Sequence, residues 1–424
     1  MEQHRLLVVG GGTAGNALAS RFSRYLPKGQ VAVVDGDPKH YYQPGFTLLG
    51  GGLAPPAALV KNREKCLPKS VKLYQVDAGE FNPAKNSVTL KDGTEIGYEF
   101  LVVSTGLDLR FDLVEGLTDA LNEENNGVCS IYRFDLAQKT YLELQRFQGG
   151  TAVFTYPNTP IKCPGAPQKI AYLADEIFRQ NNVRDKTKII FNNTLGVIFP
   201  VPKYADELMK VINSRGIELN TRDNLIKVDT KNRVATFQVI DSNQKPTDKL
   251  KEIKYDLLHV GPPCSGVESL RNAFKNGDNF TDSNGWVTVE EKTLQSKIYK
   301  NVFAFGDRAG TTNKKTAAAV ADQLRVLTPN LKAVMEGKPL PNDEYAGYAS
   351  CPTCHRFETS EFNHEGPIET MPLNQARPSF LNYWVTRYFV VWLYWNVHVK
   401  GFWSGPSKIR KVLHLGFDKQ SKQK

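Results

Sequence analysis

The stretch Arg5-Leu-Leu-Val-Val-Gly-Gly-Gly-Thr-Ala-Gly15 decides the fold, together with Val31-Ala-Val-Val-Asp35 further along the chain. The apolar run before Gly10 predicts a buried β-strand, and a helix over roughly Ala14–Tyr25 should separate it from a second strand. Asp35 stands 20 residues beyond the last glycine of the G-x-G-x-x-G pattern. A strand, a glycine turn, a helix, a strand and a terminal acid in this order predict a dinucleotide-binding unit.

Each glycine of this turn has a physical task. Gly10 permits the tight turn, Gly12 lets the backbone approach a pyrophosphate, and Gly15 lets the helix pack closely on the strand. The carboxylate of Asp35 is suited to accept hydrogen bonds from a ribose diol. The predicted cofactor contacts in this unit are Gly10, Gly12, Thr13, Ala14, Gly15 and Asp35.

Two further motifs indicate which dinucleotide binds. Asn301-Val-Phe-Ala-Phe-Gly-Asp307 reads as a strand closed by Gly-Asp before a helix over Thr316–Leu324, and Tyr98-Glu-Phe-Leu-Val-Val-Ser-Thr-Gly106 reads as a strand ending in Thr-Gly. In this order the three motifs resemble the two-dinucleotide-binding-domain flavoprotein superfamily, which implies FAD rather than NAD at the first site. The resemblance adds Thr105, Gly106, Gly306, Asp307, Lys315 and Thr316 to the predicted FAD contacts.

A second α/β unit is expected over residues 149–262, but it lacks the glycine fingerprint of a nicotinamide site. Its first strand leads into Tyr156-Pro-Asn-Thr-Pro-Ile-Lys-Cys-Pro-Gly-Ala-Pro167. Proline has no N–H to donate, so this turn is poorly suited to binding a pyrophosphate. The turn instead carries Cys163 ahead of a predicted helix over Gln168–Arg179. Both the helix N-terminus and Lys162 favour a reactive thiolate there.

The remaining cysteines fall into two groups. Six cysteines in 424 residues are too few for a disulfide-stapled secreted scaffold. Cys66, Cys129 and Cys264 have no supporting motif and are expected to be small apolar side chains. Cys351-Pro-Thr-Cys354-His355 matches C-x-x-C-H and C-x-x-C patterns. The chain there reads as a connector loop, too short for a haem domain and without the preceding strand of a thioredoxin motif.

Two cysteines alone do not complete a zinc site, so we expect no metal. The residues leave open whether Cys351 pairs locally with Cys354 or a cysteine of this loop meets Cys163 across the flavin.

The formal charge of +10 is concentrated near the C-terminus. Residues 371–424 hold nine basic side chains against Asp418 as the only acid, together with four of the five tryptophans. Tyr388–Val399 has no formal charge; it is too apolar for a phosphate-gripping surface and too short to cross a bilayer. Aromatic and basic residues in this pattern favour a monotopic membrane anchor, which a cationic stretch over Lys408–Leu413 would extend. A buried core helix or a dimer interface is the alternative.

From end to end the chain resembles the sulfide:quinone oxidoreductase family, in particular its mitochondrial-type branch. The segments that carry the resemblance are Lys39-His-Tyr-Tyr-Gln-Pro44, Phe154–Lys169, Lys315-Thr-Ala-Ala-Ala-Val320, Ser350-Cys-Pro352 and Gly401-Phe-Trp-Ser-Gly-Pro406. The resemblance implies that Cys163 and Cys351 form the redox-active pair, and it adds Gln43 to the FAD contacts. Arg308 departs from the family pattern, which has a smaller residue there, and Cys354 and His355 have no assigned role.

The family resemblance also implies the partners. Electrons would pass from hydrogen sulfide through FAD to a quinone such as ubiquinone, and sulfane sulfur would pass to glutathione or sulfite. The protein would lie peripherally on the mitochondrial inner membrane, although no presequence is visible ahead of the first strand. A nucleic-acid partner is not expected, and a homo-oligomer is compatible with the sequence.

The expected architecture is an α/β fold with two tandem Rossmann-like domains and a C-terminal amphipathic, membrane-associated helical region. We predict a FAD domain over 1–148 and 263–340, a second domain over 149–262, and a redox loop with anchoring helices over 341–424. Three alternatives compete. A type II NADH:quinone oxidoreductase needs a second glycine fingerprint, and a flavocytochrome c-type sulfide dehydrogenase subunit needs a partner-binding face. A non-enzymatic FAD protein of the apoptosis-inducing type leaves Cys163 unexplained.

Overall fold

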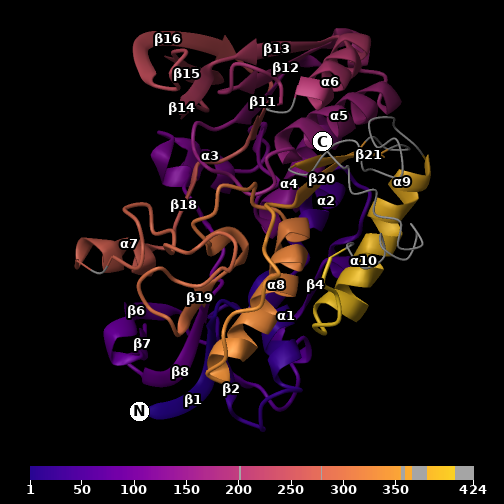
Figure 1. Ribbon diagram of the computed structural model, residues 1–424. Coiled ribbons are helices and arrows are strands. Elements are labelled where there is room, and N and C mark those ends of the chain that lie inside the picture. Colours follow the sequence, from indigo (N-terminus) through magenta and orange to yellow (C-terminus); the bar gives the residue numbers. More distant parts are fainter. Residues whose placement is uncertain (200–201, 278, 355–358, 365–379, 406–424) are drawn as a thin grey trace, which may run out of the picture.

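The structure, a computed structural model, describes residues 1–199, 202–277, 279–354, 359–364 and 380–405. His355 and the predicted cationic stretch over Lys408–Leu413 lie outside these ranges. Two parallel sheets, each covered by helices, occupy the lower and upper halves of the view in Figure 1. The predicted α/β class with two Rossmann-like sheets is confirmed.

The first sheet is centred on β1 (Glu2–Val9), whose second half is buried on both faces. The parallel strands follow the order β5 (Lys72–Tyr74), β2 (Val31–Val34), β1, β8 (Glu95–Val103) and β19 (Val302–Ala304). β7 (Ser87–Leu90) and β6 (Ala78–Asn82) extend the sheet antiparallel from the first residues of β8. In register, Val9 pairs with Val103 and Val103 with Ala304, so three motif turns meet at one edge.

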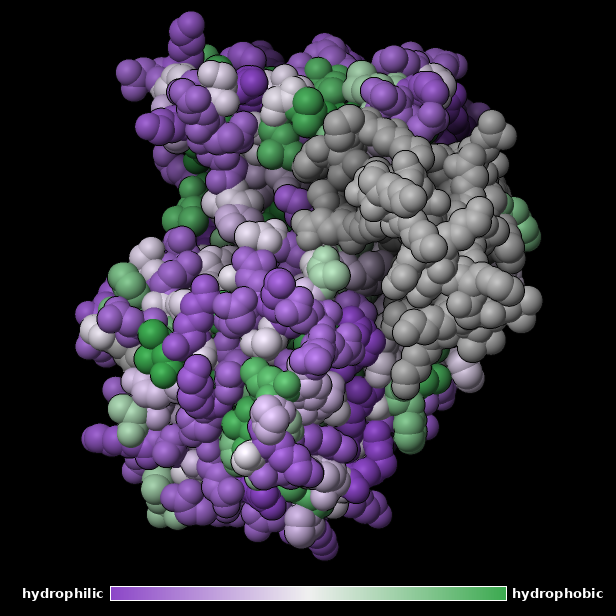
Figure 2. Space-filling model, in the orientation of Figure 1, coloured by the Kyte–Doolittle hydropathy of each residue, from purple (hydrophilic) through white to green (hydrophobic). Residues whose placement is uncertain are grey.

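Helices pack on both faces of this sheet. α1 (Thr13–Phe22) and α8 (Ala317–Met335) cover one face, where Leu18, Phe22 and Leu324 share a core with Val8. α7 (Glu268–Lys275) covers the other face. α8 is eleven residues longer at its C-terminal side than the motif indicated, because its apolar face continues along the sheet. Figure 2 shows that the visible surface of this half is mostly hydrophilic, so its apolar residues are used largely inside.

The second sheet is parallel, in the order β10 (Val128–Cys129), β17 (Leu257–Val260), β11 (Gly150–Tyr156), β12 (Thr187–Asn193) and β13 (Ile217–Thr221). Its helices are α3 (Leu117–Asn122), α4 (Phe134–Arg146), α5 (Ala166–Gln180) and α6 (Pro202–Arg215). A separate antiparallel sheet of β14 (Asp223–Asp229), β15 (Val234–Ile240) and β16 (Pro246–Lys254) lies beside it, at the upper left in Figure 1. Short pairs join β9 (Asp108–Leu109) to β18 (Cys264–Ser265) and β3 (Lys39–Tyr41) to β4 (Val60–Asn62).

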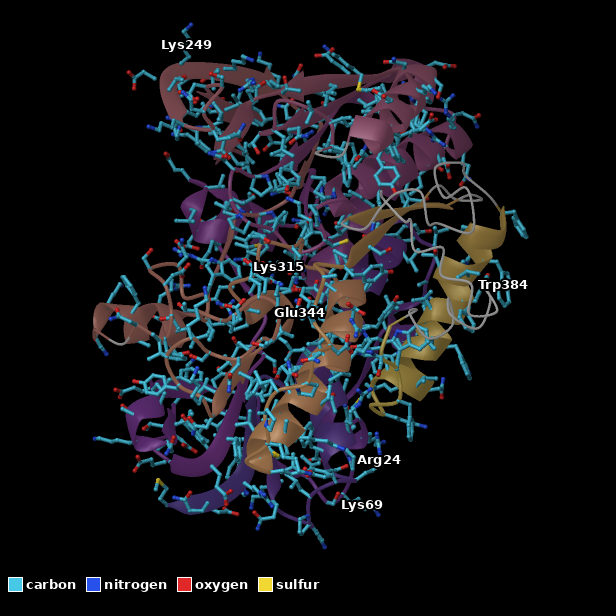
Figure 3. The ribbon with its side chains drawn as sticks, viewed as in Figure 1. Arg24, Lys69, Lys249, Lys315, Glu344 and Trp384 are labelled. Carbon is cyan, nitrogen blue, oxygen red and sulfur yellow. The ribbon has the colours of Figure 1, made fainter. Side chains whose placement is uncertain are left out.

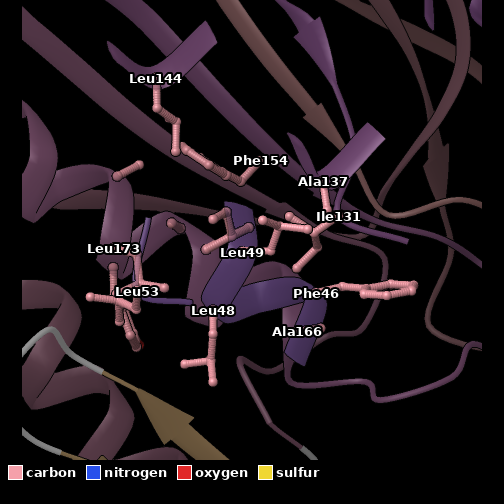
Figure 4. Close-up of a cluster of buried hydrophobic side chains, with 14 of the residues drawn as sticks. Phe46, Leu48, Leu49, Leu53, Ile131, Ala137, Leu144, Phe154, Ala166 and Leu173 are labelled. Carbon is pink, nitrogen blue, oxygen red and sulfur yellow. The ribbon is translucent and has the colours of Figure 1, made fainter. Parts of the chain in front are cut away.

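A shared core holds the two halves together. α2 (Phe46–Gly50) leaves the first half and lies among buried side chains of α4, α5 and β11. Figure 4 shows Leu49 and Phe46 of this helix beside Ile131 and Phe154. Burial of such side chains stabilises the fold by about 1.5–3 kcal/mol each, so this shared core holds the two sheets against each other.

The C-terminal part departs from one expectation. Residues around Cys351 were expected to form a loop, which is wrong: β20 (Ala349–Cys354) pairs antiparallel with β21 (Thr359–His364). A helical segment then runs through α9 (Phe380–Trp384), π-helical turns over Val385–Phe389, α10 (Val390–Leu393) and further π-helical turns over Tyr394–His398. This C-terminal helix follows the flank of the molecule in Figure 1. Among the described residues, no helix combines the length and apolar character needed to cross a bilayer.

Candidate active site

The glycine turn joins β1 to α1 with the close packing that its sequence predicts. A Cβ on Gly10 would lie 2.4 Å from the backbone oxygen of Ser104, and a Cβ on Gly15 would lie 1.8 Å from that of Gly10. Neither position tolerates a side chain. A Cβ on Gly12, in contrast, would meet no protein atom within 4 Å. The backbone at Gly12 therefore faces open space at the N-terminus of α1, where a phosphate is favoured.

Asp35 follows β2 and turns back to the glycine turn. The Gly11 N–H donates to Oδ2 of Asp35 at 2.7 Å, and Nη2 of Arg63 lies 3.0 Å from Oδ1. Burial raises the pKa of Asp35, whereas the Arg63 guanidinium and the Gly11 N–H act to lower it. Arg63 also donates to the carbonyls of Asp37 and Lys39 at 2.6 and 2.7 Å. Sequence reasoning missed this buried arginine because it belongs to no motif.

The other two predicted FAD turns lie beside the glycine turn and are tied together by Arg308. This fully buried side chain donates from Nε to the Gly106 carbonyl at 3.0 Å and from Nη1 to the Gly285 carbonyl at 2.6 Å. A Cβ on Gly106 would also meet nothing within 4 Å, and the buried Oγ1 of Thr105 has no hydrogen-bond partner among the described residues. An orphaned hydroxyl beside exposed turn backbone fits a bound dinucleotide, whose polar groups would satisfy it.

The loop before α8 completes this edge of the first sheet. Oγ1 of Thr316 accepts from the Ala319 N–H at 3.2 Å and caps the helix. Nζ of Lys315 donates to the carbonyls of Ala309 and Thr311 at 2.7 and 3.0 Å. Burial lowers the pKa of Lys315 to about 8, and the Asp307 carboxylate opposes this shift. Burial raises the pKa of Asp307, which Lys315 in turn opposes.

Cys163 lies in the β11–α5 turn and is bound directly to that loop. Its N–H donates to the Lys315 carbonyl at 2.8 Å, and its own carbonyl accepts from the Ala166 N–H at 2.8 Å. Its φ of +47° is unusual for a residue other than glycine. Figure 3 places Lys315 between the two halves of the molecule. The turn therefore holds Cys163 beside the Lys315 loop, which belongs to the predicted FAD motifs.

The cation that contacts the Cys163 sulfur is not the one expected. Nζ of the buried Lys169 on α5 lies 3.4 Å from Sγ of Cys163. Lys162, the predicted partner, instead donates to Oε1 of Gln43 at 2.7 Å and so connects the second unit to the first. Lys169 was missed because the left-handed backbone at Cys163 and the first turn of α5 bring it back to the sulfur, which a linear pattern does not reveal.

The backbone of Cys351 approaches the same region. Its strand, β20, packs against α5 and α8, the helices that begin at the Cys163 turn and after the Lys315 loop. The side chains from Cys351 to Cys354 are outside the described part of the structure. The Cys163–Cys351 pairing therefore stays a prediction.

Comparisons with known proteins identify the family of the chain. No family model matches the chain. The chain is 38% identical over 419 residues to the mitochondrial sulfide:quinone oxidoreductase of Mus musculus, covering 98% of this chain and 90% of the relative. The chain belongs to the sulfide:quinone oxidoreductase family.

Further relatives support the assignment. The Dictyostelium discoideum protein, also named as a mitochondrial sulfide:quinone oxidoreductase, is 36% identical over 411 residues, which cover 96% of this chain and 88% of that relative. The crystal structure of the sulfide:quinone oxidoreductase from Aquifex aeolicus shares the fold, with a TM-score of 0.79 at 19% identity over 98% of this chain and 96% of that chain. The family consists of FAD-containing oxidoreductases, so the resemblance found in the sequence is confirmed.

Three other cysteines of this family member are buried. Burial raises the pKa of the Cys129 thiol to about 12 and that of Cys264 to about 11, and it also raises the pKa of Cys66. A thiol with a raised pKa holds little thiolate at neutral pH and reacts slowly. The structure thus agrees with the expectation that these cysteines act as small apolar side chains.

The C-terminal helix has two contrasting faces. Phe380, Trp384, Tyr388 and Trp392, four residues apart, are 65, 49, 49 and 55% exposed. The opposite face, with Tyr394, Trp395 and Val399, is buried against the first half. Cations of the body lie beside this helix, with Arg24 4.3 Å from the Phe402 ring centre and Lys61 4.5 Å from that of Trp395. Figure 3 shows Trp384 at the outer edge.

A mostly apolar cavity lies beside the same helix. It has a volume of about 480 Å³ between α2, α4 and the π-helical turn that carries Arg387. The lining residues are Leu49, Gly52, Leu53, Ala54, Pro55, Pro56, Gln138, Tyr141, Leu142 and Arg387. Its size and apolar lining suit a small hydrophobic ligand.

Proposed function

We propose that this protein oxidises sulfide with a Cys163–Cys351 redox pair and transfers the electrons through FAD to a quinone. The observation that carries the proposal is the position of Cys163. It occupies the turn where a nucleotide-binding unit would have its glycines. Its backbone N–H donates a hydrogen bond to the carbonyl of Lys315, beside the predicted FAD motifs. Membership of the family supports the same reaction.

The residues that would hold FAD are the glycine turn with Thr13 and Ala14, Asp35 for the ribose, and the Thr105–Gly106 and Gly306–Asp307 turns. Lys315, Thr316 and Gln43 would line the flavin side. When bound, FAD supplies a two-electron acceptor. The protein contributes the placement of the thiols and the charge of Lys169.

The thiol chemistry can be written so that atoms and electrons balance. Hydrosulfide attacks the Cys163–Cys351 bridge, a new S–S bond forms to Cys351, and Cys163 leaves as a thiolate beside Lys169. A small thiol such as glutathione, or sulfite, then takes the sulfane sulfur and leaves Cys351 as a thiolate. Re-formation of the bridge releases two electrons, which bound FAD would accept, and the quinone takes up two electrons and two protons.

In this proposal the C-terminal helix binds the membrane, and the quinone site lies beside it. Exposed aromatic side chains at four-residue spacing, with Arg24 and Lys61 alongside, suit the interface of an anionic bilayer. The named relatives are mitochondrial, so we place this protein peripherally on the mitochondrial inner membrane. The apolar cavity would admit the quinone from that side.

Separate half-reactions test the redox proposal. Anaerobic addition of sulfide together with glutathione, which accepts the sulfane sulfur, should bleach the flavin band of the purified flavoprotein, and addition of ubiquinone should restore it. NADH should do neither. Rapid bleaching by NADH with no response to sulfide would contradict the proposal and favour the NADH:quinone alternative. Leu142→Gln, an exposed change in the cavity wall, should raise the KM for a ubiquinone analogue without slowing reduction by sulfide.

A vesicle-binding experiment tests the membrane proposal. Replacement of Trp384, Tyr388 and Trp392 together by Ser should weaken binding to vesicles of phosphatidylcholine and phosphatidylglycerol. Ile298→Ser, which removes an apolar side chain 51% exposed outside this face, should not. Equal binding of the parent and the triple variant would overturn the placement of the helix on the membrane.

A further inference from the structure

The buried face of the C-terminal helix reaches the glycine turn itself. Oη of Tyr394 lies 3.0 Å from Oγ1 of Thr13 and 2.8 Å from Nε2 of His40. Nδ1 of His40 lies 3.1 Å from the carbonyl of Gly11. Tyr394 and His40 are only 4 and 1% exposed. Tyr394, which is 381 residues from Thr13 in sequence, therefore links Thr13 to Gly11 through His40 in one hydrogen-bond network.

A second contact holds the same residue through its backbone. Nε2 of His398 lies 3.0 Å from the carbonyl of Thr13. One turn further along α1, Nδ2 of Asn16 donates to the Val399 carbonyl at 3.0 Å. Thr13 is thus held at both its hydroxyl and its carbonyl by the C-terminal helix.

The direction of each hydrogen bond follows from the chemistry. A carbonyl oxygen only accepts, so His40 donates from Nδ1 to Gly11 and His398 donates from Nε2 to Thr13. Burial lowers the pKa of His40 to about 3 and that of His398 to about 4, so both rings are neutral near pH 7. A neutral His40 that donates from Nδ1 accepts at Nε2. Tyr394 must therefore donate to His40, which makes its oxygen the acceptor for the Thr13 hydroxyl.

Thr13 is the first residue of α1, and its turn carries the free N–H groups that a helix start presents to a phosphate. Hydrogen bonds that fix Thr13 and Gly11 fix the direction of those N–H groups. Preorganised donors bind a ligand more tightly because less conformational entropy is lost on binding.

We propose that Tyr394 and His398 are positioning residues of the cofactor site, which hold the Gly11–Thr13 turn in the conformation that binds the FAD pyrophosphate. The proposal rests on the assignment of FAD to this turn. It makes the C-terminal helix a part of the cofactor site as well as the predicted membrane anchor. Cofactor affinity then depends on the docking of this helix against α1.

A matched pair of tyrosines in one helix tests the proposal. Tyr394→Phe removes the buried hydroxyl, whereas Tyr388→Phe removes a hydroxyl from the exposed face. In the full-length protein, Tyr394→Phe should raise the FAD dissociation constant about tenfold, as expected for the loss of buried hydrogen bonds. It should also reduce the rise in Tm that FAD causes. Tyr388→Phe should leave both within about twofold of the parent.

A conservative change separates positioning from general stability. His398→Gln retains an N–H donor and should keep most of the FAD affinity, whereas His398→Leu should lose it. If Tyr394→Phe lowers the Tm of the apoprotein but binds FAD as tightly as the parent, the residue is merely structural and the inference is wrong. If the parent itself binds no FAD, the proposed function fails as well. These two failures are therefore distinguishable.

Discussion

The turns β1–α1 and β11–α5 occupy equivalent places in the two sheets but present different chemical groups. Both follow the central strand of a parallel sheet and lead into the next helix. The first is a short glycine turn whose Gly12 backbone faces open space. The second is longer, rich in proline, and presents Cys163 in a left-handed conformation. The same fold position that offers N–H groups to a phosphate in one unit offers a thiol in the other.

The difference shows that the same strand–turn–helix arrangement can carry different chemistry in two units of one chain. Proline removes the donors that a pyrophosphate needs, and the helix that remains still provides a positive N-terminus for a thiolate. The hydrogen bond from the Cys163 N–H to the Lys315 carbonyl then holds the second turn beside the motifs of the first unit. Four groups of substitutions would test this comparison.

The largest effect is expected from Cys163→Ser. Reduction of the flavin by sulfide should slow by at least about a thousandfold, the scale on which enzymes lose activity with a nucleophile, while FAD content stays the same. Stopped-flow absorbance of the flavin band measures the rate, and Cys66→Ser, at a buried thiol away from the turn, serves as the control. Bleaching at the parental rate in Cys163→Ser would refute a thiol role for this turn.

The glycine turn should respond in a contrasting way. Gly12→Ala adds a methyl group that meets no protein atom, so the apoprotein should keep its Tm while FAD affinity falls about 10- to 100-fold through lost pyrophosphate contact. Gly15→Ala adds a methyl group 1.8 Å from the Gly10 carbonyl and should destabilise the apoprotein by about 1–3 kcal/mol. Flavin fluorescence titration and thermal melting separate the two. A loss of apoprotein stability in Gly12→Ala would show that this turn is not an open cofactor cradle.

A smaller effect is expected at Lys169. Lys169→Gln removes the ammonium beside the Cys163 sulfur, which favours the thiolate. We expect about a tenfold slower reduction by sulfide at pH 7, partial recovery as the pH rises, and better retention of activity in Lys169→Arg. A pH–rate profile is the measurement. A uniform loss at every pH would assign Lys169 to packing instead.

The smallest effect concerns Lys315, which lies where the two turns meet. Its pKa is lowered from 10.5 to about 8 in the folded protein, so between these values the unfolded chain holds more protons. Stability should therefore rise with pH in this window, and the free energy of unfolding of the parent relative to Lys315→Met should gain about 1–2 kcal/mol between pH 8 and 10. Chemical denaturation of the apoproteins at several pH values checks this. A difference that stays flat would mean that Lys315 keeps an ordinary pKa.

The sequence predicts the first turn better than the second. The spacing of Gly10, Gly12, Gly15 and Asp35 is a local pattern, and the structure has the strand, helix and strand that it implies. Contacts between side chains that only the tertiary fold brings together were not predicted. Arg63 reaches Asp35 and Lys169 reaches Cys163 only because turns bring them back. β20 was read as a loop because Ala-Ser-Cys-Pro-Thr-Cys has no alternation of apolar residues, and its partner strand, not its own pattern, makes it a strand.

The C-terminal helix illustrates the same limit. Its aromatic, uncharged sequence indicated a surface-seeking segment, and the exposed stripe from Phe380 to Trp392 agrees with that. The sequence did not indicate that Tyr394 and His398 bind the turn at Thr13, because nothing in either segment specifies a partner so far along the chain.

The pairing of Cys163 with Cys351 is the central claim, and peptide mapping tests it most directly. The oxidised protein, alkylated without reduction and digested, should yield one disulfide-linked peptide that joins the segment with Cys163 to the segment with Cys351, and the link should disappear after sulfide is added under anaerobic conditions. Alkylated Cys163 together with a Cys351–Cys354 disulfide would contradict the account.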